Sequence, residues 1–290
     1  MGSRQMAGSD NKRIGVVMDM KLHMRAGWDW LKDHLYIWII LFLYQLLWGF
    51  LLFRFMDSVI MPILRRYPSP APTEMSSQLF LLESQFQLTK TSTYTPYLWI
   101  IVAFIAVRML LTPIIHAGIC YSMANHRTES GLTFFRGIAA VWKPFALLYL
   151  LETALMLAPA YWAIPYLAEV LASNPSWQML LTGALPVSLA WLVGGWLLHH
   201  LFLFLQFGAG SDMSLLHALK NGIVHVLPVI GLSLLFVLIS LVCSTLVTTA
   251  AMLWTGMTAL ILQQAYPALR AFLKLWSLSS RYHAWNHRKP

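Results

Sequence analysis

Charged residues are scarce in this sequence. Asp, Glu, Lys and Arg make up 11% of the 290 residues, and hydrophobic residues make up 58%. A soluble globular chain contains about 25% charged residues. No long stretch is polar enough to form a soluble domain beside the apolar part. The composition therefore argues against an ordinary soluble protein and predicts a protein embedded in a lipid bilayer.

Cysteine and catalytic motifs are also rare or lacking. The two cysteines, Cys120 and Cys243, both lie in apolar runs, so we expect buried free thiols and no disulfide framework. The sequence contains no Walker loop, no Gly-x-Ser-x-Gly, no His-Glu-x-x-His and no dinucleotide fingerprint. We therefore predict a protein that is not an enzyme, with no catalytic residue, no metal ion and no cofactor.

Long apolar runs dominate what is present, and they predict an all-α fold, a polytopic bundle of transmembrane helices. About 20 apolar residues suffice to cross the hydrocarbon. Six spans are predicted, at residues 35–55, 97–121, 144–163, 177–207, 223–247 and 254–280. The last either spans the bilayer or lies on its inner surface. Residues 1–18 are polar without periodicity and predict a disordered leader, while 19–290 form a single transmembrane domain with an outer loop at 56–95.

Three amphipathic segments precede spans and share a pattern. They cover residues 19–34, 130–143 and 211–222, and each places a Lys or Arg six residues after an Asp or Ser, followed closely by Gly27, Gly137 or Gly222. The pattern predicts interfacial helices with a glycine joint before the bilayer. In addition, Tyr-x-x-x-Asn-His-Arg occurs twice, starting at Tyr121 and at Tyr282. Both observations favour a threefold helical-hairpin repeat. The alternative is that any interfacial helix before a span has this pattern.

The distribution of basic residues predicts the orientation. The net charge is +9, and Lys and Arg gather in residues 1–34, 122–143, 208–222 and 281–290, whereas loops 164–176 and 248–256 contain none. Basic loops stay on the cytoplasmic side. We therefore predict a multi-pass protein of the cell (cytoplasmic) membrane with both termini in the cytoplasm. Its predicted partners are the lipid bilayer and anionic lipid headgroups and no nucleic acid, with a membrane-protein partner or a homo-oligomer left open.

A central charge cluster is predicted inside the spans. Arg108, Glu152 and Arg270 fall within apolar runs. A charge near the middle of a bilayer costs at least about 2.5 kcal/mol, so each of these side chains needs a partner. We predict that Glu152 pairs with Arg108, and Arg270 is the competing partner. A structural bridge between helices is favoured over a role in transport.

A polar stripe marks the sixth predicted span. Its members recur at steps of three or four residues: Gln263, Pro267, Arg270, Lys274, Ser277 and Arg281. Such a stripe either faces a water-filled or anion-binding cavity, or belongs to a helix on the inner surface with snorkelling bases. We expect the cavity for Gln263–Arg270 and snorkelling for Lys274–Arg281.

Three histidines form a candidate relay. His116, His199 and His200 all fall toward the inner ends of their spans. Imidazoles can bind metals or pass protons. Their spacing matches no metal-ligand motif, and interhelical hydrogen bonds are the favoured interpretation.

Two segments carry a resemblance to known proteins. The sequences SLLHALKNGIVHVLPVIGLSLLFVLISLV and TFFRGIAAVWKPFALLYLLETALML resemble bacterial six-helix integral membrane proteins, a group that includes the membrane domain of glycerophosphodiester phosphodiesterases. The resemblance implies a bacterial cytoplasmic-membrane protein. The catalytic residues of those phosphodiesterases belong to a separate soluble domain, so no catalytic residue carries over.

The sequence leaves two hypotheses for function. The first is a small transporter-like protein that binds or moves an anionic solute or lipid headgroup, using the central charge cluster. The alternative is a non-enzymatic structural or accessory subunit of a membrane complex. A polar cavity that reaches the central charges would favour the first hypothesis. A dry interior with an exposed apolar face would favour the second.

Overall fold

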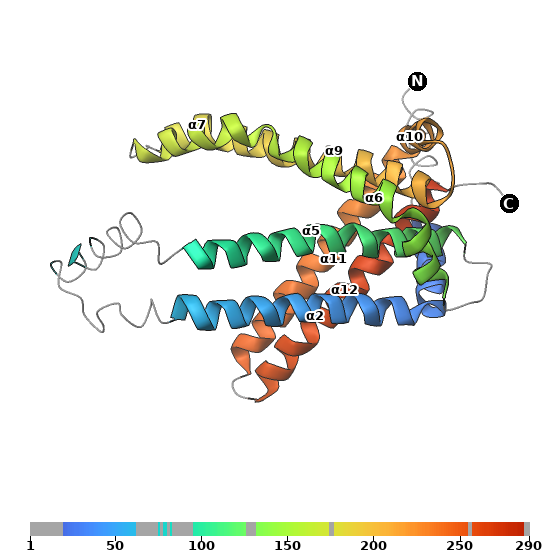
Figure 1. Ribbon diagram of the computed structural model, residues 1–290, viewed down its shortest axis with the longest axis horizontal. Coiled ribbons are helices and arrows are strands. Elements are labelled where there is room, and N and C mark those ends of the chain that lie inside the picture. The colour runs from blue at the N-terminus through green and yellow to red at the C-terminus, as the bar shows by residue number, and fades with distance from the viewer. Residues whose placement is uncertain are drawn as a thin grey trace, which may run out of the picture. The chain divides into compact units, whose positions relative to one another are not determined.

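The computed structural model describes a helical chain (Figure 1). The residues it describes are 20–61, 75, 78–79, 82, 95–125, 132–173, 177–254 and 257–286, and within them every regular element is a helix. The all-α prediction is confirmed. The predicted leader at 1–18 and most of the predicted outer loop at 56–95 lie outside the described residues.

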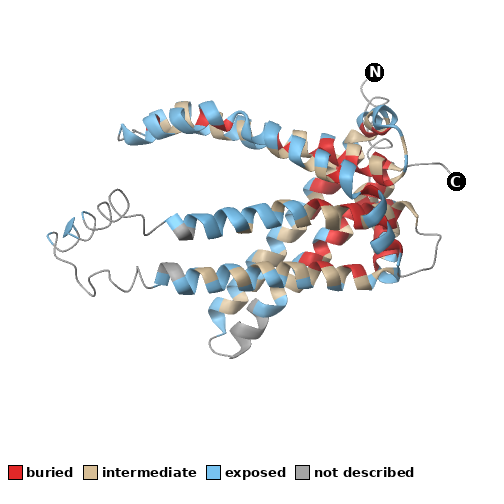
Figure 2. Cartoon of the chain, in the orientation of Figure 1, coloured by how far each residue is buried: buried red, intermediate tan, exposed pale blue. Residues whose placement is uncertain are grey.

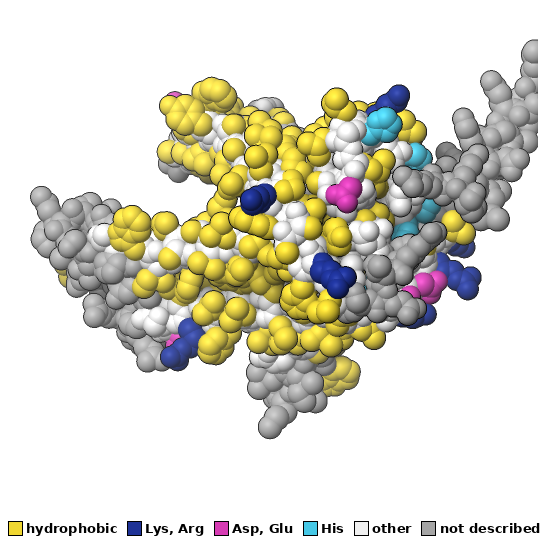
Figure 3. Space-filling view, turned by 45° about the vertical axis from the view of Figure 1, so that its right-hand side comes forward, with side chains coloured by type: hydrophobic (Ala, Val, Ile, Leu, Met, Phe, Trp, Pro, Cys, Tyr) yellow, Lys and Arg dark blue, Asp and Glu magenta, His cyan; other side chains and the backbone are white. Residues whose placement is uncertain are grey.

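Five helical stretches are long and apolar enough to cross a membrane. In the described part of the chain they are Leu35–Ser58, Leu98–Ala124, Thr133–Ala172, Trp177–Gly210 and Val226–Leu253. Hydrophobic side chains cover most of the face shown in Figure 3, with charged side chains scattered among them. Exposure on this scale is unfavourable in water, at about 25 cal/mol per Å² of apolar surface, but not in hydrocarbon. These features indicate a multi-pass membrane protein.

The chain forms two compact units. The small unit is Ile39–Thr112, and the large unit combines Met1–Trp38 with Pro113–Pro290.

The small unit is a pair of helices, α2 (Leu35–Phe55) and the first part of α5 (Thr95–Ala124), with a π-helical turn (Met56–Ile60) after α2. The ring of Phe104 in α5 packs edge-on against Trp48 and Phe55 of α2. The Tyr44 and Thr112 hydroxyls lie 3.0 Å apart, and Thr112 donates its hydrogen to the Arg108 carbonyl at 2.7 Å. Tyr44 therefore donates to Thr112, and one polar contact joins the two helices.

The large unit contains the remaining helices. They are a helix over residues 20–33, the end of α5, α6 (Thr133–Leu157), α7 (Ala160–Ala172), α8 (Trp177–Met179), a π-helical turn (Leu180–Ala184), α9 (Leu185–Gly210), α10 (Leu215–Val224), α11 (Val226–Leu253) and α12 (Met257–Trp285). In this unit α6 packs along α9, α10 packs on α9, and α11 packs along α12 (Figure 1).

The structure corrects one predicted boundary. Residues 130–143 were expected to form a separate interfacial helix before a span at 144–163, but α6 runs unbroken from Thr133 through Pro144 to Leu157. A proline removes only one backbone hydrogen bond, and helices in membranes tolerate that loss. The candidate span is therefore longer and reaches from Thr133 to Ala172. By contrast, α10 ends at Val224 before α11 begins, as the pattern at 211–222 predicted.

The buried side chains of the large unit gather at one end of its helices. Figure 2 shows α6 and α9 buried near α10 and exposed toward α7. Trp285, the last residue of α12, is fully buried there. Its indole nitrogen donates to the Ala218 carbonyl at 3.2 Å, and its own carbonyl accepts from the Asn221 amide at 2.7 Å. These two bonds fix the end of α12 against α10.

The three glycines of the amphipathic segments lie at close helix contacts. They pack on residues near the ends of other helices: Gly27 on Ser280, Gly137 on Tyr121 and Gly222 on Phe204. A Cβ atom added to Gly27 would lie 2.5 Å from the Ser280 hydroxyl oxygen, and one added to Gly137 would lie 2.5 Å from Cβ of Tyr121. Close packing therefore requires glycine at these positions. The sequence pattern had predicted only a flexible joint there.

Candidate functional site

A groove of about 790 Å³ lies between α11 and α12 in the large unit. Its polar lining comprises Ser233, Ser240, Ser244 and Thr245 of α11 and Tyr266, Arg270, Lys274, Ser277 and Arg281 of α12. Its apolar lining comprises Phe236, Val237, Leu241 and Leu273. We call this the α11–α12 groove.

Helical periodicity explains why these side chains share one groove. On α12 the polar lining residues recur at steps of three or four, which places them on one face of the helix. On α11 the serines at 233, 240 and 244 are separated by seven and four residues and also share a face. The stripe residues that line the groove are Arg270, Lys274, Ser277 and Arg281. The groove thus extends beyond Gln263–Arg270 into Lys274–Arg281, the part for which snorkelling was predicted. Gln263 lies in α12, but its side chain is outside the described residues.

The groove is rich in positive charge. Its lining contains three cations, Arg270, Lys274 and Arg281, and among the described lining residues there is no Asp or Glu. Nε of Arg281 donates to the Ser277 carbonyl at 3.2 Å. Within the described part of the chain, Arg270 and the two terminal nitrogens of Arg281 have no hydrogen-bond or ion-pair partner. A cation in an apolar setting is stabilised by a counter-ion, so the groove is suited to an anion.

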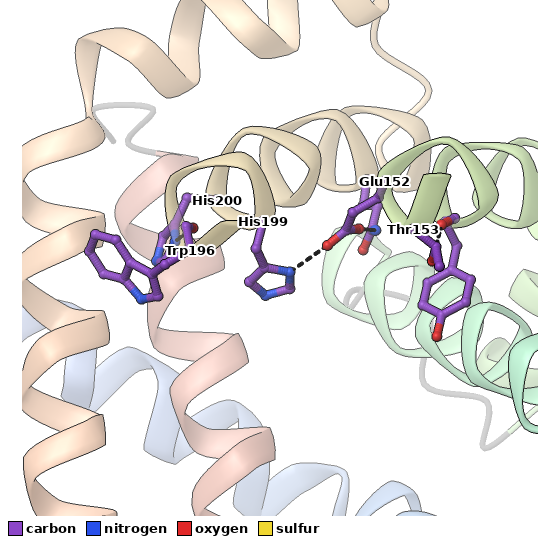
Figure 4. A network of polar contacts seen from close by, with 7 residues as sticks. Glu152, Thr153, Trp196, His199 and His200 are labelled. Atoms are coloured by element: carbon purple, nitrogen blue, oxygen red, sulfur yellow. Dashed lines mark hydrogen bonds and ion pairs between the residues drawn. The ribbon is translucent and has the colours of Figure 1, made fainter. Parts of the chain in front are cut away.

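A second polar cluster joins α5, α6 and α9. Glu152 of α6 is 8% exposed, and its two carboxylate oxygens accept hydrogen bonds from α9 (Figure 4). Nδ1 of His199 donates to Oε1 at 2.7 Å, and the Gln206 amide donates to Oε2 at 3.3 Å. Gln206 also hydrogen-bonds to His116 of α5. We call Glu152, His116, His199 and Gln206 the histidine–glutamate network.

His200 connects α9 to the groove. Its Nδ1 lies 2.8 Å from the Trp196 carbonyl, which can only accept, so Nδ1 carries a hydrogen. In the neutral ring Nε2 then accepts, and the Ser233 hydroxyl donates to it at 2.9 Å. Because Ser233 also lines the groove, His200 lies directly behind the wall of the groove.

Cations of the groove lie close enough to the histidines to act on them electrostatically. The charges of Lys274 and Arg281 act on His116, and the charge of Arg281 also acts on His200. The rings of His199 and His200 lie 5.9 Å apart at 85°. The three histidines predicted as a relay therefore lie beside one another and beside two cations of the groove. Within the described residues, no three His, Cys, Asp or Glu side chains are placed to hold a metal ion.

The two arginines predicted as partners of Glu152 lie in different parts of the structure. Arg108 belongs to the small unit, where its side chain is exposed, and its pairing with Glu152 stays a prediction. Arg270 lines the α11–α12 groove. Among the described residues, the hydrogen-bond partners of the Glu152 carboxylate are His199 and Gln206.

Sequence reasoning missed two parts of the site. Gln206 follows His199 by seven residues, two helical turns, so both side chains reach the same face of α9. The serine stripe of α11 also has a helical spacing that was readable in the sequence. Neither signal says which helix lies opposite, and that information comes only from the packing.

Comparison of the chain with protein-family models, with curated proteins and with solved structures finds no match.

Proposed function

We propose that this chain is a multi-pass membrane protein that binds an oxyanion, a free anion or the headgroup of an anionic lipid, in the α11–α12 groove. The observation that carries the proposal is the groove lining, in which three cations and a row of hydroxyls occur with no described carboxylate. A transporter or a headgroup-binding protein would use the same site.

The dimensions of the groove support a small ligand. Its volume of about 790 Å³ falls within the range of about 300–1,000 Å³ that is typical of small-molecule sites. Arginine binds phosphate-like groups through two parallel hydrogen bonds, and serine hydroxyls add further donors. Arg270 and Arg281 are eleven residues apart, about 16 Å along the helix. A single oxyanion therefore contacts one end of the groove.

The register of the hairpin identifies that end. The rings of Phe236 and Trp276 lie 5.0 Å apart, so these residues are level on α11 and α12. Counting four residues along each helix, Ser240 lies level with about residue 272. Ser240 is then flanked by Arg270 and Lys274, which are one turn apart. These three residues are the proposed anion-binding centre.

Binding of two probes tests the proposal. We expect purified protein in a neutral detergent to bind sulfate, short-chain phosphatidylglycerol or both, measured by calorimetric titration. Arg270→Gln should weaken binding at least about tenfold, or about 1.4 kcal/mol. The matched control is Arg136→Gln, because Arg136 is exposed on α6 and away from the groove.

The two probes separate the outcomes. Binding of sulfate indicates a free anion as the ligand, and binding of phosphatidylglycerol alone indicates a lipid headgroup. If neither probe binds to the wild-type protein, the proposed function is wrong and the accessory-subunit hypothesis remains. If Arg270→Gln binds as tightly as Arg136→Gln, the site is wrong.

We further propose that α12 is a sixth span and that both termini face the cytoplasm in the cell membrane. Two features support this topology: α12 packs back along α11 as a hairpin, and its 29 residues correspond to about 43 Å, longer than the hydrocarbon. A tag at the C-terminus should resist protease in intact cells and be cut after lysis. Cleavage in intact cells would contradict the orientation.

The threefold hairpin repeat is also proposed. In its support, each proposed hairpin ends in a helix that packs on the glycine of an amphipathic segment: α5 on Gly137, α9 on Gly222 and α12 on Gly27. The two copies of the Tyr-x-x-x-Asn motif also end their helices alike. The backbone N–H of Asn125 donates to the Tyr121 carbonyl at 3.0 Å, and the backbone N–H of Asn286 donates to the Tyr282 carbonyl at 2.8 Å.

A further inference from the structure

We propose that anion binding in the α11–α12 groove is coupled to proton uptake by the histidines behind it, so that the anion and a proton bind together. The inference rests on the proposed anion site. It adds a second ligand, the proton, and assigns it to the histidine–glutamate network and His200.

The first step is the proton site. The Glu152 carboxylate is buried and holds Nδ1–H of His199 at 2.7 Å. Because Nδ1–H is held by the carboxylate, Nε2 is the ring nitrogen that carries the lone pair, and the His199 side chain is 44% exposed. The proton adds to the lone pair of Nε2 and leaves an imidazolium beside a carboxylate, and no other bond forms or breaks. A charge-assisted hydrogen bond of this length stabilises that ion pair.

The second step is the electrostatic link to the groove. The charged and titratable groups that act on His116 are Lys274 and Arg281 of α12 and His199 of α9. Those acting on His200 are Arg281 and His199. Lys274 and Arg281 also line the groove. An anion held there opposes their field at the histidines, and an added positive charge in the network becomes more favourable.

The third step is a hydrogen-bond link through Ser233. Its hydroxyl lines the groove and donates to Nε2 of His200 at 2.9 Å. His200 is therefore one hydrogen bond away from the groove, and an anion held on the cations of the groove opposes their positive field at this ring as well. Anion binding thus favours proton binding, and the reverse also holds.

Calorimetric titration in buffers of different ionisation enthalpy tests the coupling. The probe is whichever of sulfate and short-chain phosphatidylglycerol binds, because neither changes its own protonation near the ordinary histidine pKa of about 6.5. The titrations are run at several pH values from about pH 5 to about pH 8, on both sides of that ordinary value, and we expect net proton uptake on binding. With one proton taken up per anion, the affinity should rise about tenfold for each unit of decrease in pH.

Two matched variants test the assignment of the proton site. Glu152→Gln removes the charge that stabilises the His199 imidazolium and should at least halve the proton uptake. Glu169→Gln should leave it unchanged, because Glu169 is exposed on α7. If Glu152→Gln does not yield folded protein, His199→Gln carries the same expectation.

The outcomes distinguish the two proposals. Anion binding with no proton uptake at any pH in this range overturns the coupling and leaves the proposed function standing. Uptake that is unchanged in Glu152→Gln and in His199→Gln also overturns it. If neither probe binds, the proposed function fails and the coupling fails with it.

Discussion

Glu152 shows how a buried charge is held in this protein. Each of its carboxylate oxygens has a donor, His199 for one and Gln206 for the other, at 2.7 and 3.3 Å. Both donors lie on one face of α9, two turns apart. A buried carboxylate without such donors is strongly unfavourable. The pair of donors therefore stabilises the contact between α6 and α9 as well as the charge.

Replacement of this carboxylate should destabilise the fold. Glu152→Gln removes the charged acceptor of His199, and we expect a loss of about 1–3 kcal/mol in the free energy of unfolding. Thermal unfolding of the purified protein in detergent measures the change. The matched substitution Glu169→Gln, at an exposed site on α7, should stay within about 0.5 kcal/mol of wild type. Equal stability of the two variants would contradict the role of Glu152.

The partner of Glu152 was beyond prediction from the sequence. Charge alone pointed to Arg108 and Arg270, because an opposite charge is the usual partner of a carboxylate in a membrane. The histidine partner depends on which face of α9 meets α6, and helix packing decides that. The seven-residue spacing of His199 and Gln206 was visible, but the helix opposite was not.

The groove was the most predictable element. Side chains at steps of three or four must share a face of a helix, so the stripe from Arg270 to Arg281 was readable before the structure. The structure adds the serines of α11 on the opposite wall. Adjacent helices joined by a short connection pack antiparallel, but their relative rotation, which turns the serines toward the cations, does not follow from the sequence.

The start of the span in α6, by contrast, was predicted wrongly from the sequence. The amphipathic pattern and Pro144 predicted two separate helices, yet Thr133–Leu157 is one helix. Proline disfavours a helix interior by about 3 kcal/mol in water. In hydrocarbon an interrupted helix would leave backbone groups without partners, so continuing the helix is the better solution.

Close helix contacts make a prediction at this scale. Gly222→Ala should destabilise the protein by about 1–3 kcal/mol, since the new methyl group would overlap the Phe204 ring. Gly137→Ala should behave alike, because its Cβ would lie 2.5 Å from Cβ of Tyr121. Thermal unfolding measures both.

Gly194 in α9 provides the control for these substitutions. A Cβ there meets nothing within 4 Å, so Gly194→Ala should be neutral or stabilise by up to about 1 kcal/mol through its higher helix propensity. A destabilising Gly194→Ala together with a neutral Gly222→Ala would contradict the packing described here.

The whole molecule is best understood with hydrocarbon as its solvent. Five long apolar helical stretches occur in the described residues, and the large side chains on their surfaces remain exposed. In that setting three cations along one groove are exceptional, because ionisable groups within membranes mark sites of ligand or ion interaction. The account therefore depends on the groove being open to water and electropositive.

Thiol chemistry tests that claim most directly. A single cysteine, Ser240→Cys, is placed in the groove after replacement of Cys120 and Cys243, and Ser214→Cys, at an exposed position before α10, is the control. The rates of modification by negatively and positively charged methanethiosulfonates are compared at both positions. The account predicts that the ratio of anionic to cationic rate is at least about tenfold higher in the groove, or about 1.4 kcal/mol. No reaction at Ser240→Cys, or equal ratios at the two positions, would contradict it.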